Sequence, residues 1–594
     1  MHKKGLAAAV VVLALGAAAC GGKSPSQTAS GTTGASATAS SAGQSQETFQ
    51  VVEDPTATGP APAVAGSQQG GTVDVLTAVV PTKFDPTQAY YIDALAVLRT
   101  VTRTMVEMAL QSDGKYHLTP DLGTDLGQHN ADFTEWTFHL KKGMKYEDGT
   151  EIKAQDFAYS VERSFAQTEL PGGPTYQITY FKDGDTYKGP YADKTPYNGV
   201  STPDDYTLVM KMSKPFADLP YYMTFPVFSP IPQAKDTKSN YGLHPLASGP
   251  YKFGKYTPGK ELTLVKNDQW DAASDPGRHQ FVDQYDFQFG LDSLQVQNRL
   301  IADKGPDQLA TTYDNVDSST LPQILNKEPQ KRMLTGAGTC TDLYALDMRK
   351  ITNLKVRQAI YAAYPFDNTH KAAGDSTFTY EPATTILPKV TPGWENFDVS
   401  VNKNGGKGNG DPIAAKKLLT EAGAVGFELK TLLADGDAQA AKVAAVKKEA
   451  FEAAGFKYSI QTLPKDKVRD EVNDPNAALN IRYAGWCIDW PSGGTVFPAV
   501  YDGRLIAASP TGVPNPSFLN DPKANAEMDR IAALPSAQQP PEWAKLDKTI
   551  MTDDLPVIPV DYSKIAYLSG SKVGGTVMDS FAGGPDFTKL FIKQ

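Results

Sequence analysis

Residues 136–163 read WTFHLKKGMKYEDGTEIKAQDFAYSVER. The first five of them alternate apolar with polar side chains, a pattern typical of a strand with one buried face. Asp148-Gly149 is a turn signal, and the apolar side chains of residues 152–164 recur with helical spacing. The stretch therefore predicts a strand, a turn and a helix in direct succession.

Strands and helices are predicted on both sides of this stretch. Residues 71–80 alternate around valines and predict a strand, and residues 93–110 carry apolar side chains at helical spacing. Further on, a strand at 427–433, an alanine-rich helix at 437–454 and a strand at 456–463 follow one another. Such a unit predicts parallel pairing with a right-handed crossover. The predicted fold class is α/β.

The composition is that of a globular protein with a modest negative charge. Hydrophobic residues make up 40% and charged residues 21% of the chain, as is usual for folded domains. The formal net charge is −10, so no basic surface argues for nucleic acid as a partner. About 520 residues follow residue 70, more than one hydrophobic core usually serves, so we expect at least two lobes.

The first 20 residues have the organisation of an export signal. Two lysines precede an apolar run from Leu6 to Ala19, and Cys20 follows three alanines. The run resembles a lipobox, in which cleavage precedes a cysteine that is then acylated, although Ala17 stands where leucine is more usual. We expect residues 1–19 to be removed as a lipoprotein signal peptide and Cys20 to be lipidated. An ordinary secretory signal with an incidental cysteine is the alternative.

Residues 20–70 are expected to be a disordered tether. They consist mostly of Ser, Thr, Ala, Gly, Gln and Pro, and so few large apolar side chains cannot offset the entropy of ordering the chain. The globular body would begin near Gly71 and hang from the extracytoplasmic face of a cell membrane, held by acyl chains on Cys20.

Two cysteines remain after Cys20. Cys340 and Cys487 would share an oxidising compartment in an exported protein, which favours a disulfide over two free thiols. Two buried thiols that never meet are the alternative. The sequence leaves this open, because bonding depends on whether the two Cα atoms lie within about 7 Å.

Motifs that carry catalysis or bind metals are missing from the sequence. No two of the seven histidines are three or four residues apart, and there is no H-E-x-x-H or C-x-x-C pattern. Nucleophile-elbow, Walker and dinucleotide-binding motifs are missing as well. We therefore expect that the chain is not an enzyme and holds no metal or cofactor.

A set of short segments, spread in order along the body, carries a family pattern. AQDFAYSVER at 154–163 is the most distinctive. The others are FDP (84–86), PDL (120–122), WTFHLKKG (136–143), YEDGT (146–150), SGPYK (248–252), LTLVKN (262–267), VRQAI (356–360) and KLLTEAG (417–423). Together they resemble the extracytoplasmic solute-binding proteins of peptide-type ABC importers, family 5, over nearly everything from Gly71 to the end.

The resemblance implies a two-lobe periplasmic-binding-protein-like fold (class II, or cluster C), with an extra subdomain in the first lobe and a hinge between lobes. The implied division is lobe I at 71–87, 236–337 and 555–594, its inserted subdomain at 88–235, and lobe II at 338–554. The chain would cross between the lobes near Gly336–Thr339 and again near Asp554–Pro559. Glycines at the first crossing suit a hinge.

The sequence AGWCID at residues 484–489 resembles a stretch of the oligopeptide-binding members. There the cysteine forms a disulfide, and the aspartate two residues on pairs with the ligand's α-ammonium group. Carried over, Cys487 would bond to Cys340, and Asp489 would bind the amino terminus of a peptide. An ammonium group taken out of water needs a charged partner, and a nearby disulfide would hold that partner in place. A turn residue before Pro491 is the alternative for Asp489.

Three further residues near Asp489 are candidates for the ligand pocket. Trp486 and Trp490 could line it, because aromatic faces accept varied side chains, or could be core residues. Arg482 could meet the carboxylate of a peptide, although its spacing from the cysteine differs from the family example by one residue. The predicted site therefore holds binding residues only.

The resemblance implies a lipid-anchored, monomeric receptor that binds oligopeptides between its lobes and delivers them to an ABC importer. The peptide main chain would pair with strand edges, and its side chains would sit in roomy, water-filled pockets. The expected partners are the peptide, the permease and ATPase subunits of the transporter, and the membrane. Alternative ligands are dipeptides, nickel chelates, haem and oligosaccharides. A sensory lipoprotein and a secreted hydrolase are the alternative functions.

Overall fold

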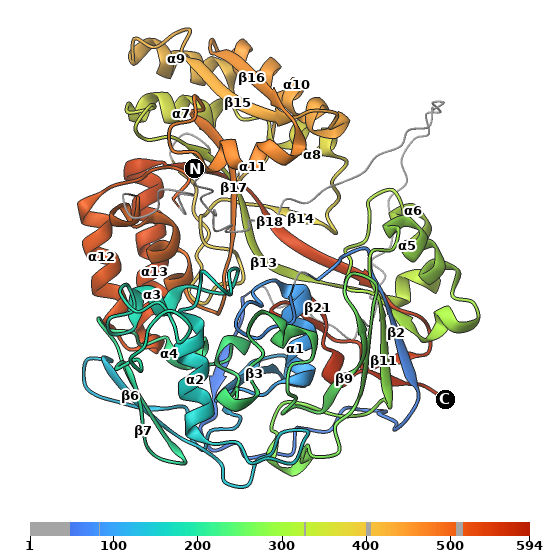
Figure 1. The fold of residues 1–594 in the computed structure, drawn as a ribbon. Coiled ribbons are helices and arrows are strands. Elements are labelled where there is room, and N and C mark those ends of the chain that lie inside the picture. The colour runs from blue at the N-terminus through green and yellow to red at the C-terminus, as the bar shows by residue number, and fades with distance from the viewer. Residues whose placement is uncertain (1–47, 82, 326–327, 400–404, 507–514) are drawn as a thin grey trace, which may run out of the picture.

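The computed structural model describes residues 48–81, 83–325, 328–399, 405–506 and 515–594. Within them the elements gather in two lobes, which are joined through the long strands β13 (Met333–Leu346) and β18 (Val557–Leu568) (Figure 1). The predicted signal peptide at 1–19 and the predicted lipidation site Cys20 lie outside the described residues.

A five-stranded sheet forms the centre of the first lobe, in the order β12-β2-β11-β10-β9. Its strands are β2 (Thr72–Leu76), β9 (Tyr251–Thr257), β10 (Glu261–Lys266), β11 (Gln284–Gln288) and β12 (Ala310–Thr311). β9, β10 and β11 form an antiparallel meander, whereas β2 pairs in parallel with both β11 and β12. Helices α1 (Ile92–Val101) and α5 (Ser293–Ala302) pack their apolar sides against the core of this lobe.

Helix α1 corrects two expectations. It ends at Val101, not at residue 110, and strand β3 (Val106–Leu110) follows it. The run from Thr100 to Thr104 is rich in β-branched side chains, which disfavour a helix. The helix packs Val97 and Leu98 against the sheet of lobe I, so the inserted subdomain starts after α1 and not at residue 88.

Two sheets make up the inserted subdomain. The larger, in the order β5-β6-β8-β7, contains β5 (Gln128–His129), β6 (Glu135–His139), β7 (Val200–Asp204) and β8 (Thr207–Lys211). The smaller, β1-β4-β3, adds β1 (Val51–Glu53) and β4 (Tyr116–Pro120). Helix α2 (Ala154–Ser164) buries Phe157 and Val161 in the same core. β6 and α2 confirm the strand and helix predicted from residues 136–163. Two short helices, α3 (Tyr176–Tyr180) and α4 (Leu219–Tyr222), complete the subdomain.

Lobe II is built around a four-stranded sheet in the order β14-β18-β13-β17, with β14 (Tyr380–Pro382) and β17 (Ile481–Cys487) at its edges. Beside it, β15 (Glu428–Ala434), α10 (Ala438–Ala453) and β16 (Lys457–Leu463) form the predicted unit, with β15 and β16 parallel. Asp437 caps α10 by accepting a hydrogen bond from the Ala440 amide.

The other helices of lobe II are α7 (Leu354–Ala363), α8 (Phe366–Ala373), α9 (Pro412–Glu421), α11 (Lys465–Asn473), α12 (Pro522–Ala532) and α13 (Gln539–Thr549). The remaining short elements are α6 (Leu321–Ile324), β19 (Val573–Gly574), β20 (Met578–Asp579), β21 (Gly584–Pro585) and β22 (Phe591–Ile592).

The strands β13 and β18 pair antiparallel along their whole length, from Met333↔Leu568 to Ala345↔Val557. The pairing is irregular between Ala337 and Thr341, which are opposite Lys564 and Tyr562. Because β13 and β18 are paired residue by residue, they cross between the lobes side by side. The second crossing, on β18, is therefore opposite residues 337–341 and lies near residue 563, not at 554–559. The side chains agree, because Ile558 is buried in the core of lobe II, whereas Leu568 is buried with α5 of lobe I.

Residues 48–70 correct the expectation that the tether extends to residue 70. β1 pairs in parallel with β4, and the Phe49 amide donates to the Val390 carbonyl at 2.8 Å. The Phe49 ring is 5% exposed and lies 5.1 Å from the ring of Tyr116 and 4.9 Å from that of Phe581. The average composition of 20–70 hides one apolar cluster at residues 49–52, and this cluster is enough to anchor the chain.

We expect Phe49→Ala to lower the free energy of unfolding by about 2–4 kcal/mol, because it leaves a cavity among buried aromatic rings. Chemical denaturation followed by tryptophan fluorescence measures the loss. Val80→Ala is the control, since Val80 is 45% exposed and its truncation should cost less than about 0.5 kcal/mol. Equal losses in the two variants would mean that residues 48–70 are not part of the folded body.

Candidate ligand-binding site

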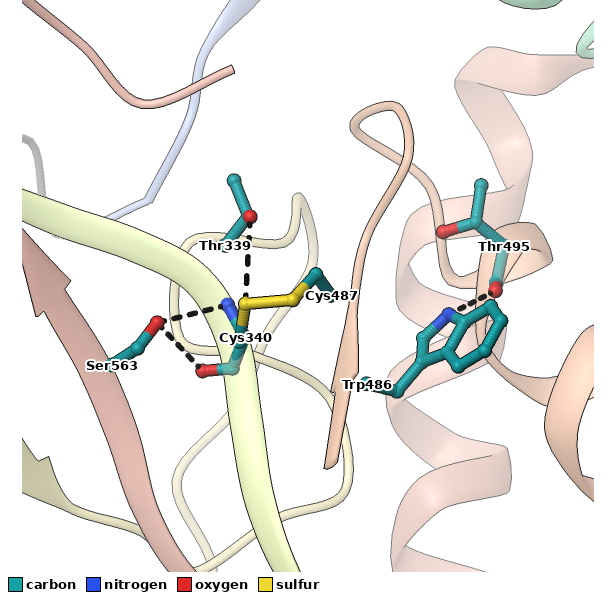
Figure 2. The surroundings of a disulfide bond; sticks show 6 residues. All are labelled: Thr339, Cys340, Trp486, Cys487, Thr495 and Ser563. Atoms are coloured by element: carbon teal, nitrogen blue, oxygen red, sulfur yellow. Dashed lines mark hydrogen bonds between the residues drawn. A yellow bond between two sulfur atoms is a disulfide. The ribbon is translucent and has the colours of Figure 1, made fainter. Parts of the chain in front are cut away.

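Strand β17 leads directly into the predicted site and is fixed to β13 by a disulfide. Cys340 and Cys487 lie opposite each other in the antiparallel register, with their Cα atoms 3.8 Å apart, and their sulfur atoms are bonded (Figure 2). The Cys340 amide also donates to the Ser563 hydroxyl on β18 at 3.1 Å. The end of β17 is therefore held covalently to the central strands, two residues before Asp489.

Asp489 follows β17 and reaches across to the first lobe. Its half-buried carboxylate accepts hydrogen bonds from the hydroxyls of Tyr90, at 2.7 Å, and Tyr176, at 2.5 Å. Burial raises the pKa of Asp489 to about 6, and the two tyrosine hydrogen bonds only partly oppose that rise. Among the described residues, no lysine, arginine or histidine nitrogen lies within 4.0 Å of this carboxylate. The carboxylate is thus placed between the lobes without a cation.

Trp490, the next residue, closes the contact between the lobes. Its side chain is 1% exposed, packs among the aromatic rings of the inserted subdomain and donates from Nε1 to Asp218 at 3.0 Å. A cavity of about 10 Å³, room for one water molecule, lies between Phe216 of the subdomain and Trp543 of lobe II. A peptide has no room at this point.

The two tryptophans of the predicted site have different surroundings. Trp490 is a core residue of the interface between the lobes, which corrects its assignment as a pocket residue. Trp486 is half-buried, packs on the core of lobe II and donates from Nε1 to the Thr495 carbonyl at 2.7 Å (Figure 2). Only Trp486 keeps part of its side chain available to a ligand.

Arg482 is not available to a ligand carboxylate. It lies at the start of β17, roughly 17 Å along the strand from Cys487, and is 2% exposed. Its guanidinium group binds Asp347 at 2.9 Å and donates to the carbonyls of Val472 and Asp474. All of this corrects its assignment as a binding residue, because a buried guanidinium that already has a carboxylate partner serves the fold.

Arg469, on α11, is a candidate that the sequence did not reveal. Its Nη2 atom is buried without a hydrogen-bond partner, and within the described chain it forms no ion pair. Its charge influences the hydroxyl of Tyr91, the neighbour of the Tyr90 that binds Asp489. Nothing in the local sequence KVRDEVN distinguishes this arginine, because its lack of a partner depends on the tertiary fold. Tyr90 and Tyr176 were missed for the same reason.

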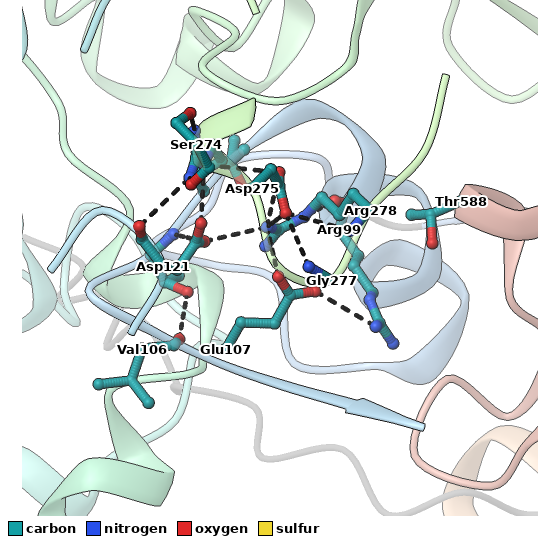
Figure 3. Close-up of polar contacts among 12 residues, drawn as sticks. Arg99, Val106, Glu107, Asp121, Ser274, Asp275, Gly277, Arg278 and Thr588 are labelled. Atoms are coloured by element: carbon teal, nitrogen blue, oxygen red, sulfur yellow. Dashed lines mark hydrogen bonds and ion pairs between the residues drawn. The ribbon is translucent and has the colours of Figure 1, made fainter. Parts of the chain in front are cut away.

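One group of acidic residues has the spacing of a metal site. Glu107, Asp121 and Asp275 are buried with carboxylate oxygens within 4.8 Å of one another. The Nη1 atom of Arg278 lies 2.6 Å from Glu107, 3.0 Å from Asp121 and 3.2 Å from Asp275 (Figure 3). Arg103 adds a second guanidinium, 2.7 Å from Asp121. Because arginine already neutralises the group, these residues do not fit a metal ion and instead join the subdomain to lobe I.

The comparisons with known proteins agree with this geometry. The sequence model of the bacterial extracellular solute-binding proteins, family 5, matches residues 117–505. The chain belongs to this family. The periplasmic oligopeptide-binding protein OppA of Salmonella typhimurium is 25% identical over 519 residues, which cover 83% of this chain and 87% of that protein. The oligopeptide-binding protein OppA of Bacillus subtilis is 21% identical over 76% of this chain and 80% of its own length.

Solved structures show the same two-lobe fold. Clavulanic acid biosynthesis oligopeptide binding protein 2 superposes with a TM-score of 0.80 at 25% identity, covering 89% of this chain and 96% of that one. The periplasmic binding protein DppA from Helicobacter pylori, in complex with peptide STSA, gives a TM-score of 0.67 at 17% identity, covering 89% and 99%. This solute-binding protein is therefore a binding protein and not an enzyme. Among the residues that the structure describes, no helix has the length and apolar character needed to cross a bilayer.

The raised pKa of Asp489 predicts how stability depends on pH. Between about pH 4 and pH 6 the folded chain binds more protons than the unfolded chain, so its stability falls as the pH rises through this window. We expect Asp489→Asn to stabilise the ligand-free protein by about 1–2 kcal/mol at pH 8 and to have no effect at pH 4. Thermal unfolding at the two pH values measures this difference.

The exposed Glu169→Gln is the control and should change stability little at either pH. Equal effects of Asp489→Asn at pH 4 and pH 8 would show that the carboxylate is not desolvated between the lobes.

Proposed function

We propose that this protein is a membrane-anchored extracytoplasmic receptor that binds oligopeptides between its two lobes and delivers them to an ABC importer. The observation that carries the proposal is the Asp489 carboxylate, which is held between the lobes without a cation. A peptide ammonium group supplies the missing charge. Its arrival favours the ionised carboxylate, so the energy lost by burying Asp489 is recovered when the ligand binds.

The strand next to Asp489 supports recognition of a peptide main chain. β17 is an edge strand in the described part of its sheet, so its outer side can pair with an extended chain. Arg482 at its start donates to Val472 of α11, which places α11 at that end, whereas Asp489 follows the other end. A peptide with its amino terminus at Asp489 would extend along β17 toward α11.

We assign the carboxylate end of the peptide to Arg469 of α11. Its Nη2 atom has no hydrogen-bond partner, and its charge acts on the hydroxyl of Tyr91, the residue after Tyr90. A zwitterionic peptide would then find a negative group at one end of β17 and a positive group at the other. Recognition of the termini and the main chain suits ligands of varied sequence.

The family relatives support the wider role. The relatives described above are named for oligopeptide binding, and a relative from Sinorhizobium fredii is named a probable peptide ABC transporter periplasmic-binding protein. Lobe closure would form the surface that a permease recognises, while the ATPase subunit supplies energy. Lipid on Cys20 would anchor a monomeric receptor to the cell membrane, and residues 21–47 would serve as the tether. The Ser-, Thr- and Ala-rich composition of this segment supports that part of the proposal.

Asp489→Asn tests the ammonium site. We expect it to weaken the binding of Ala-Ala-Ala-Ala at least 30-fold in isothermal titration calorimetry, because a charge-assisted contact is lost in a desolvated site. N-acetylated Ala-Ala-Ala-Ala, which has no ammonium group, should bind the wild type weakly and the variant about equally. A variant that loses affinity for both peptides by the same factor would contradict the assignment.

Arg469→Gln tests the carboxylate site in the same way. Its affinity for the free peptide should fall at least 10-fold, whereas the affinity for the C-terminal amide should change less than twofold. Lys467→Gln, on an exposed position of the same helix, is the matched control. If Arg469→Gln has no more effect than this control, the peptide carboxylate lies elsewhere.

A further inference from the structure

Two aspartates of lobe II face each other in a way that weakens the sheet. Asp342 on β13 is directly opposite Asp561 on β18 in the antiparallel register, and both are half-buried. Like charges directly opposite each other in a sheet are destabilising. Among the described residues, no lysine, arginine or histidine nitrogen lies within 4.0 Å of either carboxylate. The pair therefore lacks a cation of its own, and its two carboxyl groups share a hydrogen bond with each other instead.

The carboxylate of Asp342 lies next to β17, the edge strand of the sheet. It lies beside Gly485 on β17, where an added Cβ atom would be only 2.8 Å from Asp342 Oδ1. A side chain at 485 would force this carboxylate to move. Because residue 485 is a glycine, the Asp342 carboxylate can lie against the backbone of the edge strand β17, on the face that carries Tyr483 and Cys487.

Buried polar atoms next to the pair lack partners. Tyr364 is fully buried, its hydroxyl makes no hydrogen bond, and it lies close enough to Asp561 to be affected by that charge. His370 is 4% exposed, and its Nε2 atom also has no partner, although its Nδ1 atom contacts Asp375 at 2.9 Å. The Lys447 ammonium group, 2% exposed, donates to the Tyr483 hydroxyl at 2.8 Å. The unpartnered Tyr364 hydroxyl and His370 Nε2 atom mark an incomplete site.

We propose that Asp342 and Asp561 form a subsite for a cationic side chain, arginine or lysine, of a peptide that lies along the outer edge of β17. The proposal rests on the proposed function and adds a preference for one class of ligand. Neighbouring strands lie about 4.8 Å apart. A side chain from the bound peptide would therefore cross above Gly485 and reach Asp342, a distance that suits long cationic side chains and not short acidic ones.

The position of the subsite selects the peptide residue. Gly485 lies four residues before Asp489, or roughly 13 Å along an extended chain. With the ammonium group at Asp489, the cationic side chain would belong to the second, third or fourth residue of the peptide. The first residue is too close to Asp489.

Proton release from Asp342 and Asp561 on ligand binding is a second measurable consequence of the proposal. Burial and the charges of Asp342 and Asp375 raise the pKa of Asp561 to about 9, so the pair holds a proton at neutral pH. Burial also lowers the pKa of Lys447 to about 7, which weakens the only buried amine nearby in the described chain. The groups that face the pair are Asp375, His370, Lys447, Tyr364, Tyr380 and Tyr483. A bound guanidinium group would favour two ionised carboxylates, and the proton would pass to the buffer.

The test uses Ala-Ala-Arg-Ala and its citrulline analogue, with the cationic residue also moved to positions 2 and 4. Citrulline keeps the size of arginine and removes its charge. Titration calorimetry of the purified full chain should show at least a 10-fold preference for arginine at one of these positions. In Asp342→Asn/Asp561→Asn the preference should fall below twofold, while the citrulline peptide keeps its affinity.

Asp286→Asn is the matched control, because Asp286 is opposite Asp74 in the sheet of lobe I and should keep the preference intact. At pH 7, titrations in buffers of different ionisation heat should show about one proton released with the arginine peptide and none with the citrulline peptide. Affinity for the arginine peptide should rise from pH 6 to pH 8. Equal affinity of the wild type for the two peptides, or a preference that survives the double substitution, would overturn the subsite but not the receptor. Failure of both peptides to bind would overturn both.

Discussion

The charge of Asp489 is opposed by burial at a contact between the two lobes, and the proposed receptor depends on that opposition. Two tyrosine hydroxyls hold the carboxylate without neutralising it, so the ligand-free site is stable but incomplete. In the proposed function, a cation that arrives with the ligand would complete it. The same carboxylate would then both select the ligand and contribute free energy that keeps the lobes together.

The parts of both lobes that flank Asp489 are held rigidly. On lobe II, the disulfide and the paired strands β13 and β18 fix the end of β17. On lobe I, Arg278, Arg103 and Arg99 pair with three buried carboxylates and join the inserted subdomain to the sheet. The irregular pairing between Ala337 and Thr341 is the place where the two long strands can bend. Closure can then move the two halves of the site as units, without reshaping either one.

Local patterns predicted the elements whose structure depends on neighbours in sequence. The alternation in 136–140 and the strand, helix and strand of 427–463 both reappear, because periodicity alone determines which face is buried. Order and spacing of short segments predicted the family, whereas the ligand-binding role of Asp489 stays a prediction. Contacts between distant residues could not be predicted. Arg482 is occupied by Asp347, 135 residues away, whereas Arg469 has no partner, and no local signal separates the two arginines.

A crystal structure of the protein with a tripeptide bound tests the central claim most directly. The account predicts the peptide nitrogen within about 3 Å of an Asp489 carboxylate oxygen, which is the length of a charge-assisted hydrogen bond, and an extended main chain beside β17. A peptide bound with its ammonium group in solvent, and with Asp489 still contacting only Tyr90 and Tyr176, would contradict it.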